Sequence, residues 1–138
     1  MFSISEFSTV YDLLKNNELD KANIILRKLR NSFFIHPDYL FLMSLFLLKS
    51  NRTYLSIDSL LLSLKVDNTV EVLKKHSYKN SSDSLVEERY LLLITLFKKL
   101  KIFQIVKMLE VSMKEKDPTS FLFYLEEIMP GIRLKNKL

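Results

Sequence analysis

The residues of this 138-residue chain whose types could support catalysis or metal binding are few and widely spaced. Histidine occurs only at His36 and His76, and neither has carboxylates at metal-ligand spacing on one helix. We therefore expect both histidines to lie on the surface and no metal to be bound. The chain has no cysteine, which excludes a disulfide framework, a thiolate zinc site and a cysteine nucleophile.

Two acidic pairs and a single glycine are the other candidates for chemistry. Glu87-Glu88 and Glu126-Glu127 are sequence neighbours, and adjacent helix positions point in different directions, so neither pair forms a catalytic dyad. Gly131 is the only glycine, which leaves none for a phosphate-binding loop or a nucleophile elbow. We expect no enzymatic activity, no cofactor and no small-molecule substrate.

The composition is that of one folded domain, with 48 % hydrophobic and 27 % charged residues. The longest nearly unbroken apolar stretch, Tyr39 to Leu48, is too short to cross a bilayer. The first residues lack the basic and then apolar pattern of a signal peptide. We expect an intracellular protein, cytoplasmic or nuclear, that does not associate with membranes.

The spacing of apolar residues predicts an all-α fold, because they recur every three or four positions and the chain has little glycine or proline for tight turns. Asn17 is expected to be the N-cap of the second helix. After Pro130-Gly131 we expect a basic tail over residues 132–138, and before the later helices a polar loop over 78–83. The predicted helices cover about residues 5–16, 19–33, 37–49, 53–65, 70–77, 85–99, 102–116 and 118–129.

An internal repeat appears when the chain is shifted by 34 residues, which brings Asn17 onto Asn51, Ala22 onto Ser56 and Leu26 onto Leu60. This helix-turn-helix period resembles the tetratricopeptide repeat family. In that family small residues stand where the two helices of a repeat touch, and Ser44, Ser56 and Ser63 occupy those positions in the second repeat. The resemblance implies a short right-handed α-solenoid of three degenerate helical hairpins with an extra helix and a cap. Its parts are one domain over 1–131, repeats at 3–36, 37–70 and 86–119, an insertion at 70–84 and a C-terminal capping helix at 118–129.

Three short strings are similar to the opening helices of the tetratricopeptide subunit of the anaphase-promoting complex, a ubiquitin ligase of the cell cycle. They are Val10 to Leu14, Leu40 to Ser44 and Arg89 to Leu92. That region dimerises in the family. The resemblance therefore implies a protein-interaction scaffold that self-associates or belongs to a larger assembly.

In tetratricopeptide stacks the first helix of each pair lines a concave face that holds the ligand. The resemblance gives this face an apolar floor with a lysine row, which suits a helical peptide or a second copy of the chain. Two alternatives stay open, namely that the apolar side chains are core and that the lysines only meet solvent and the helix dipole. The implied partner-binding residues are Phe7, Tyr11, Leu14, Phe41, Leu45, Leu48, Tyr90, Ile94 and Phe97, with Lys15, Lys49 and Lys98 in the row.

The net charge of +5 supports a different function, docking on RNA or the ribosome. Residues 1–69 carry eight Lys and Arg against seven Asp and Glu, whereas residues 70–138 carry thirteen against nine. A low-GC genome would also enrich lysine, so codon bias is a second explanation for the excess. The candidate RNA contacts are Lys98, Lys99, Lys101, Arg133, Lys135 and Lys137.

Overall fold

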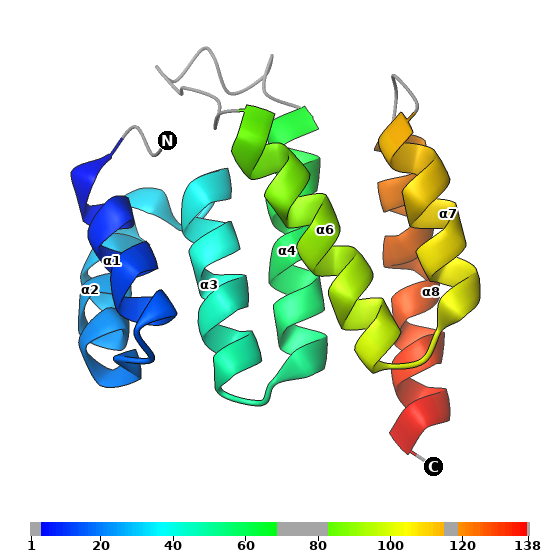
Figure 1. The fold of residues 1–138 in the computed structure, drawn as a ribbon, viewed down its shortest axis with the longest axis horizontal. Coiled ribbons are helices and arrows are strands. Elements are labelled where there is room, and N and C mark those ends of the chain that lie inside the picture. The colour runs from blue at the N-terminus through cyan, green and yellow to red at the C-terminus, as the bar shows by residue number, and fades with distance from the viewer. Residues whose placement is uncertain (1–3, 69–82, 115–118, 138) are drawn as a thin grey trace.

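The computed structural model describes residues 4–68, 83–114 and 119–137, so the expected helix over 70–77 and nearly all of the polar loop over 78–83 lie outside the described residues. Within these ranges the chain forms seven helices and no strand, and the all-α prediction is confirmed (Figure 1). None of these helices is long and apolar enough to cross a membrane. The helices are α1 (Ser5–Lys15), α2 (Leu19–Phe33), α3 (Pro37–Lys49), α4 (Thr53–Asn68), α6 (Asp83–Lys99), α7 (Phe103–Lys114) and α8 (Thr119–Lys137).

Three pairs of helices are joined by turns of one geometry: α1 with α2, α3 with α4, and α6 with α7. In each turn one residue has a left-handed backbone, with φ of 59° at Asn17, 62° at Asn51 and 61° at Lys101. The next amide donates to the carbonyl five residues earlier, as in a Schellman motif. These bonds run from Glu18 to Leu13, Arg52 to Leu47 and Ile102 to Phe97, with N···O distances of 2.9, 2.8 and 3.0 Å.

The turn geometry corrects two details of the sequence interpretation. Asn17 is not the N-cap of α2, because that position belongs to Glu18, which makes no side-chain capping bond. Asn17 instead supplies the left-handed residue, a conformation that asparagine tolerates better than most residues. The turns at Asn51 and Lys101 are 50 residues apart, one more than the expected spacing of 49 between the second and third repeats.

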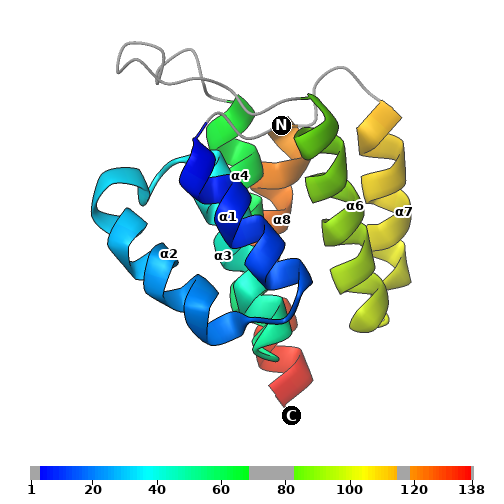
Figure 2. The same cartoon turned by 60° about the vertical axis from the view of Figure 1, so that its left-hand side comes forward.

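The core consists of two apolar clusters that meet at α3. Phe41 belongs to the cluster with α4, α6, α7 and α8, whereas Leu42 belongs to the cluster with α1 and α2. Helix α3 is apolar nearly all round, and it packs against α1, α2 and α4. The hairpin of α1 and α2 lies at one end of the molecule and α7 at the other (Figures 1 and 2).

Three serines lie at the close contact between α3 and α4, where the repeat pattern placed small residues. Ser44, Ser56 and Ser63 are each 0 % exposed. The Ser56 hydroxyl donates to the Ser44 carbonyl and the Ser63 hydroxyl to the Pro37 carbonyl, both at 2.7 Å. Small side chains allow the two backbones to approach, and the hydroxyls find acceptors across the interface.

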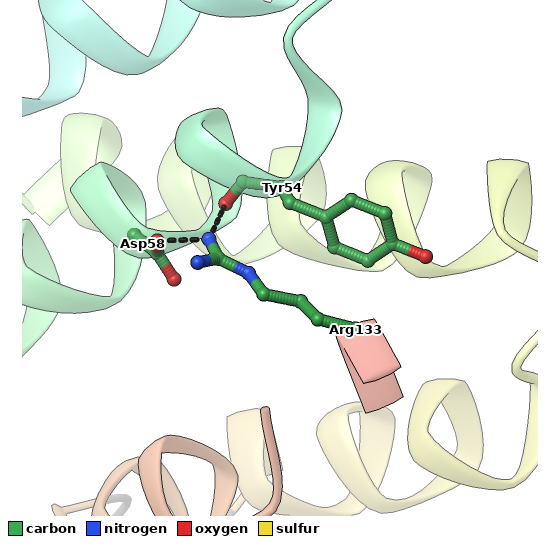
Figure 3. Close-up of polar contacts among 3 residues, drawn as sticks. All are labelled: Tyr54, Asp58 and Arg133. Carbon is green, nitrogen blue, oxygen red and sulfur yellow. Dashed lines mark hydrogen bonds and ion pairs between the residues drawn. The ribbon is translucent and has the colours of Figure 1, made fainter. Parts of the chain in front are cut away.

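Helix α8 continues through Pro130 and Gly131 to Lys137, so the predicted end at Met129 and the separate tail over 132–138 are wrong. Proline removes one amide donor from a helix, but contacts beyond it can keep the helix going. Here Arg133 forms an ion pair with Asp58 and donates to the Tyr54 carbonyl at 3.0 Å, both on α4 (Figure 3). A second ion pair joins Lys65 of α4 to Glu126 of α8. These contacts fix the end of α8 against α4.

Candidate protein-binding surface

The nine apolar residues expected on the first-helix face are mostly core residues. Three of them, Tyr11, Leu45 and Leu48, are partly buried and pack against the two clusters. The other six are at most 6 % exposed: Phe7, Leu14, Phe41, Tyr90, Ile94 and Phe97. A partner could touch those six only if the helices separated, so the burial favours the core interpretation of this face over an open groove.

Tyr11 closes the first-helix face by linking α1 to α6. Its hydroxyl donates to the Glu88 carboxylate at 3.3 Å, and its ring centroid lies 6.4 Å from that of Phe41. The Tyr11 ring therefore lies beside Phe41 of α3 while its hydroxyl reaches α6. This contact joins residues 77 positions apart. No local sequence pattern could have indicated it.

The lysine row is exposed, but two of its members make contacts within the chain. The Lys15 ammonium lies 4.4 Å from the centroid of the Tyr11 ring. The Lys49 ammonium donates to the Asn17 side-chain oxygen at 2.9 Å, which ties the end of α3 to the turn between α1 and α2. Lys98, on α6, is exposed at the other end of the row. The three lysines thus have different roles in the structure.

Some of the candidate RNA contacts are exposed, and one is engaged within the chain. Lys98, Lys99 and Lys101 are exposed next to one another at the turn between α6 and α7. Arg133 is engaged with Asp58 and Tyr54 on α4, as Figure 3 shows. The side chains of Lys135 and Lys137 lie outside those that the structure describes. The structure therefore brings together three of the six cations.

A buried polar cluster, which sequence reasoning missed, lies at the start of α3. His36 is 9 % exposed, Asp38 1 %, and Ser63 and Arg89 0 %. The expectation that His36 lies on the surface is wrong, because its ring packs 5.1 Å from that of Phe7. His76 lies outside the described residues. Arg89 donates to the Ser63 hydroxyl at 2.9 Å, which connects α6 to α4.

Serine, histidine and aspartate are the residue types of nucleophilic catalysis. In this cluster, however, the serine hydroxyl donates to a backbone carbonyl and the histidine Nδ1 accepts from a backbone amide. The Ser63 hydroxyl donates to the Pro37 carbonyl, and His36 Nδ1 accepts from the Asp38 amide at 3.1 Å as the N-cap of α3. Burial, and then the charge of Arg89, lowers the pKa of His36 to about 4. The imidazole is therefore neutral at pH 7 and caps a helix.

Two shallow hollows, of about 310 and 210 Å³, lie between α4 and α8 and share Asp58 and Met129 as lining residues. The charged groups around them are already paired across the two helices, Asp58 with Arg133 and Lys65 with Glu126. These groups serve the packing of α8. No group of three or more histidines and carboxylates that could hold a metal occurs among the residues the structure describes.

Large apolar side chains are exposed at the two ends of the molecule. At the α7 end these are Phe103 and Val111, each 58 % exposed. At the α2 end they are Ile24, Phe34 and Ile35, which are 56, 63 and 46 % exposed. The last two residues form the turn that leads into α3.

Cations accompany the exposed apolar residues of α2. We use the name α2 outer surface for Ile24, Arg27, Lys28, Phe34 and Ile35. Arg27 and Lys28 are exposed, and in the described ranges no acidic side chain forms an ion pair with them. Over the whole of α2 there are four cationic side chains and one acidic one.

Sequence reasoning missed the α2 outer surface. Counting charge by halves gave residues 1–69 an excess of only one positive charge, which hid the local excess on α2. The signal that could have found the surface is that Ile24, Phe34 and Ile35 fall outside the apolar stripe of the helix. Large apolar residues opposite a helix's core-facing stripe are candidates for contact with another molecule.

Comparison with protein-family models, with curated proteins and with solved structures gives no match. The tetratricopeptide resemblance therefore stays a prediction from the sequence. The function of this chain is therefore inferred from its own surface.

Proposed function

We propose that this chain is a non-catalytic protein-binding scaffold built from tetratricopeptide-like helical hairpins. The observation that carries the proposal is the exposure of three large apolar residues, Ile24, Phe34 and Ile35, on α2 and the turn that follows it. Clustered exposed apolar side chains with a polar surround are typical of protein-interaction sites. The three hairpins with a common turn geometry support the scaffold part of the proposal.

The α2 outer surface replaces the first-helix face as the proposed binding site. A partner on the first-helix face would have to break the hydrogen bond between Tyr11 and Glu88 and uncover Phe41. The α2 outer surface needs no such rearrangement, because its side chains already meet solvent. Self-association and membership of a larger assembly such as the anaphase-promoting complex are parts of the proposal that rest on the sequence resemblance alone.

Quantitative affinity capture from the protein's own cells tests the proposal. The wild-type chain is compared with Phe34→Glu, which places a charge on the α2 outer surface, and with Leu55→Glu as a matched control on exposed α4, where Leu55 is 47 % exposed. We expect Phe34→Glu to lose one or more discrete proteins that wild type and Leu55→Glu retain, with all three chains equally helical by circular dichroism. Identical protein content in all three captures would contradict the proposal.

RNA docking is the second candidate function, and the exposure of Lys98, Lys99 and Lys101 at one turn favours it. Phosphate contacts of this kind are blind to sequence and weaken steeply with salt. In the same captures, material that depends on these three lysines and disappears after nuclease treatment would support RNA docking. Protein that survives nuclease and depends on Phe34 would support the scaffold.

A further inference from the structure

We propose that the α2 outer surface binds an acidic amphipathic helix of a partner protein. This inference rests on the proposed protein-binding function and adds the chemical class of the partner. The observation behind it is that the exposed cations Arg27 and Lys28 stand between exposed Ile24 on α2 and exposed Phe34 and Ile35 in the turn after α2.

The spacing of these side chains suits a helical partner. Ile24 and Lys28 are four residues apart on one side of α2, Arg27 lies beside them on the neighbouring stripe, and Phe34 and Ile35 follow in the turn at the end of the helix. Ile24 and Phe34 are ten residues apart, which is about 15 Å or three turns along a helix. A partner helix of similar length can place an apolar stripe against Ile24, Phe34 and Ile35 along this whole distance.

The charge of the surface selects an acidic partner. Arg27, Lys28 and Arg30 are exposed, whereas the acidic residue Asp20 stands at the start of α2. Lys21 is already paired with Glu18 at 3.3 Å. Carboxylates on the edges of a partner stripe would meet Arg27 and Lys28, and arginine can bind a carboxylate through two parallel hydrogen bonds. A basic partner would be repelled by the same groups.

The other exposed surfaces do not combine these two properties. The exposed face of α7 carries Phe103 and Val111, but it holds a cation and an anion, Lys107 and Glu110. The charges between α4 and α8 are already paired with one another. The exposed lysines at the turn between α6 and α7 are followed in the chain by exposed Phe103. Among the surfaces described, the α2 outer surface joins three large exposed apolar side chains to an excess of cations, with Asp20 as the one acidic residue of its helix.

A set of three synthetic peptides tests the proposal by amide NMR titration of the full chain. Each peptide has about 15 residues, long enough for about four helical turns. The three share one apolar stripe and differ only in carrying Glu, Gln or Lys at the polar positions. We expect the Glu peptide to bind about tenfold or more tightly than the Gln peptide and the Lys peptide to bind least, with shifts centred on residues 20–35. Binding of the Glu peptide should weaken as salt is raised.

Charge-reversal variants supply the matched control. Arg27→Glu combined with Lys28→Glu should weaken the Glu peptide about tenfold and favour the Lys peptide. Arg52→Glu combined with Lys107→Glu makes the same change in net charge at exposed positions elsewhere and should leave Glu-peptide binding unchanged. Ile24→Ser should weaken all three peptides, because it removes apolar contact. Equal weakening by both charge-reversed chains would overturn the proposal, since it would show attraction to net charge alone.

The remaining outcomes separate this inference from the proposed function. If the Gln or Lys peptide binds best on α2, the acidic class is overturned and protein binding through α2 stands. If no peptide shifts the α2 resonances, the inference is overturned, and the affinity captures decide the broader function. Phosphatidylserine vesicles or polyuridylate that bind α2 more tightly than the Glu peptide would overturn the inference in favour of a membrane or RNA ligand.

Discussion

Lowering the pH should destabilise the fold through His36. This imidazole is 9 % exposed, packs against the rings of Phe7 and Phe33, which also contact each other, and accepts a hydrogen bond from the Asp38 amide through Nδ1. Protonation of Nδ1 removes that acceptor and places a charge in a buried site near Arg89. The folded state therefore resists protonation, whereas the unfolded chain does not.

The size and direction of the effect follow from the pKa difference. Burial first and Arg89 second lower the pKa of His36 from its ordinary value of 6.5 to about 4. Above pH 6.5 His36 is neutral in both states and does not affect stability. As the pH falls from 6.5 to about 4, the unfolded chain takes up the proton first, so the free energy of unfolding falls. The upper bound of this loss is between about 3 and 4 kcal/mol, at about 1.4 kcal/mol per pKa unit.

Denaturant unfolding followed by circular dichroism at several pH values measures the loss. The control variant is His36→Asn, because asparagine is a good N-cap acceptor that does not titrate. Carboxylates titrate in both proteins, so the difference between them isolates His36. Wild type should lose about 2 to 3 kcal/mol more than His36→Asn between pH 6.5 and 4. Equal losses in the two proteins would refute the reasoning.

Three further predictions concern packing and turns, each measured as a change in the free energy of unfolding. Lys101→Gly should stabilise the protein by up to about 1 kcal/mol, because Lys101 has φ of 61°; a loss of stability would contradict the turn geometry. Ser56→Ala should cost less than about 1 kcal/mol but Ser56→Leu about 1 to 3 kcal/mol, because Ser56 is fully buried between α3 and α4. Equal effects would contradict that close contact. In a double-mutant cycle Arg133→Ala and Asp58→Ala should couple by no more than about 1 kcal/mol, because both groups are partly exposed. Zero coupling, together with unchanged hydrogen exchange of residues 131–134, would mean that Arg133 does not anchor α8.

Local patterns predicted the helices, because apolar periodicity and polar turns act over a few residues. The serines between α3 and α4 were also predictable, because the repeat register marks positions where helices approach closely. Asn17 shows the limit of such reasoning. Asparagine suits both an N-cap and a left-handed turn, and only the backbone of the fold distinguishes the two.

The errors arose where distant residues meet. Pro130 and Gly131 predicted a helix end, but Arg133 reaches Asp58, 75 residues away, and the helix continues. His36 was wrongly expected on the surface. Its contact with Phe7 joins α1 to the start of α3, and no local sequence pattern indicates a contact between these two segments. For the first-helix face the sequence left both a groove and a core open, because nothing near Tyr11 in the sequence points to Glu88. Each error is a tertiary contact that overrides a local preference.

Site-specific photo-crosslinking in intact cells tests the proposal that the α2 outer surface binds a protein. A photoreactive amino acid replaces Phe34, which is 63 % exposed, or Leu55 on α4, which is 47 % exposed. We predict a discrete protein adduct from position 34 that is absent from position 55 and that Arg27→Glu combined with Lys28→Glu diminishes. No protein adduct at position 34, or the same adducts from both positions, would contradict the claim.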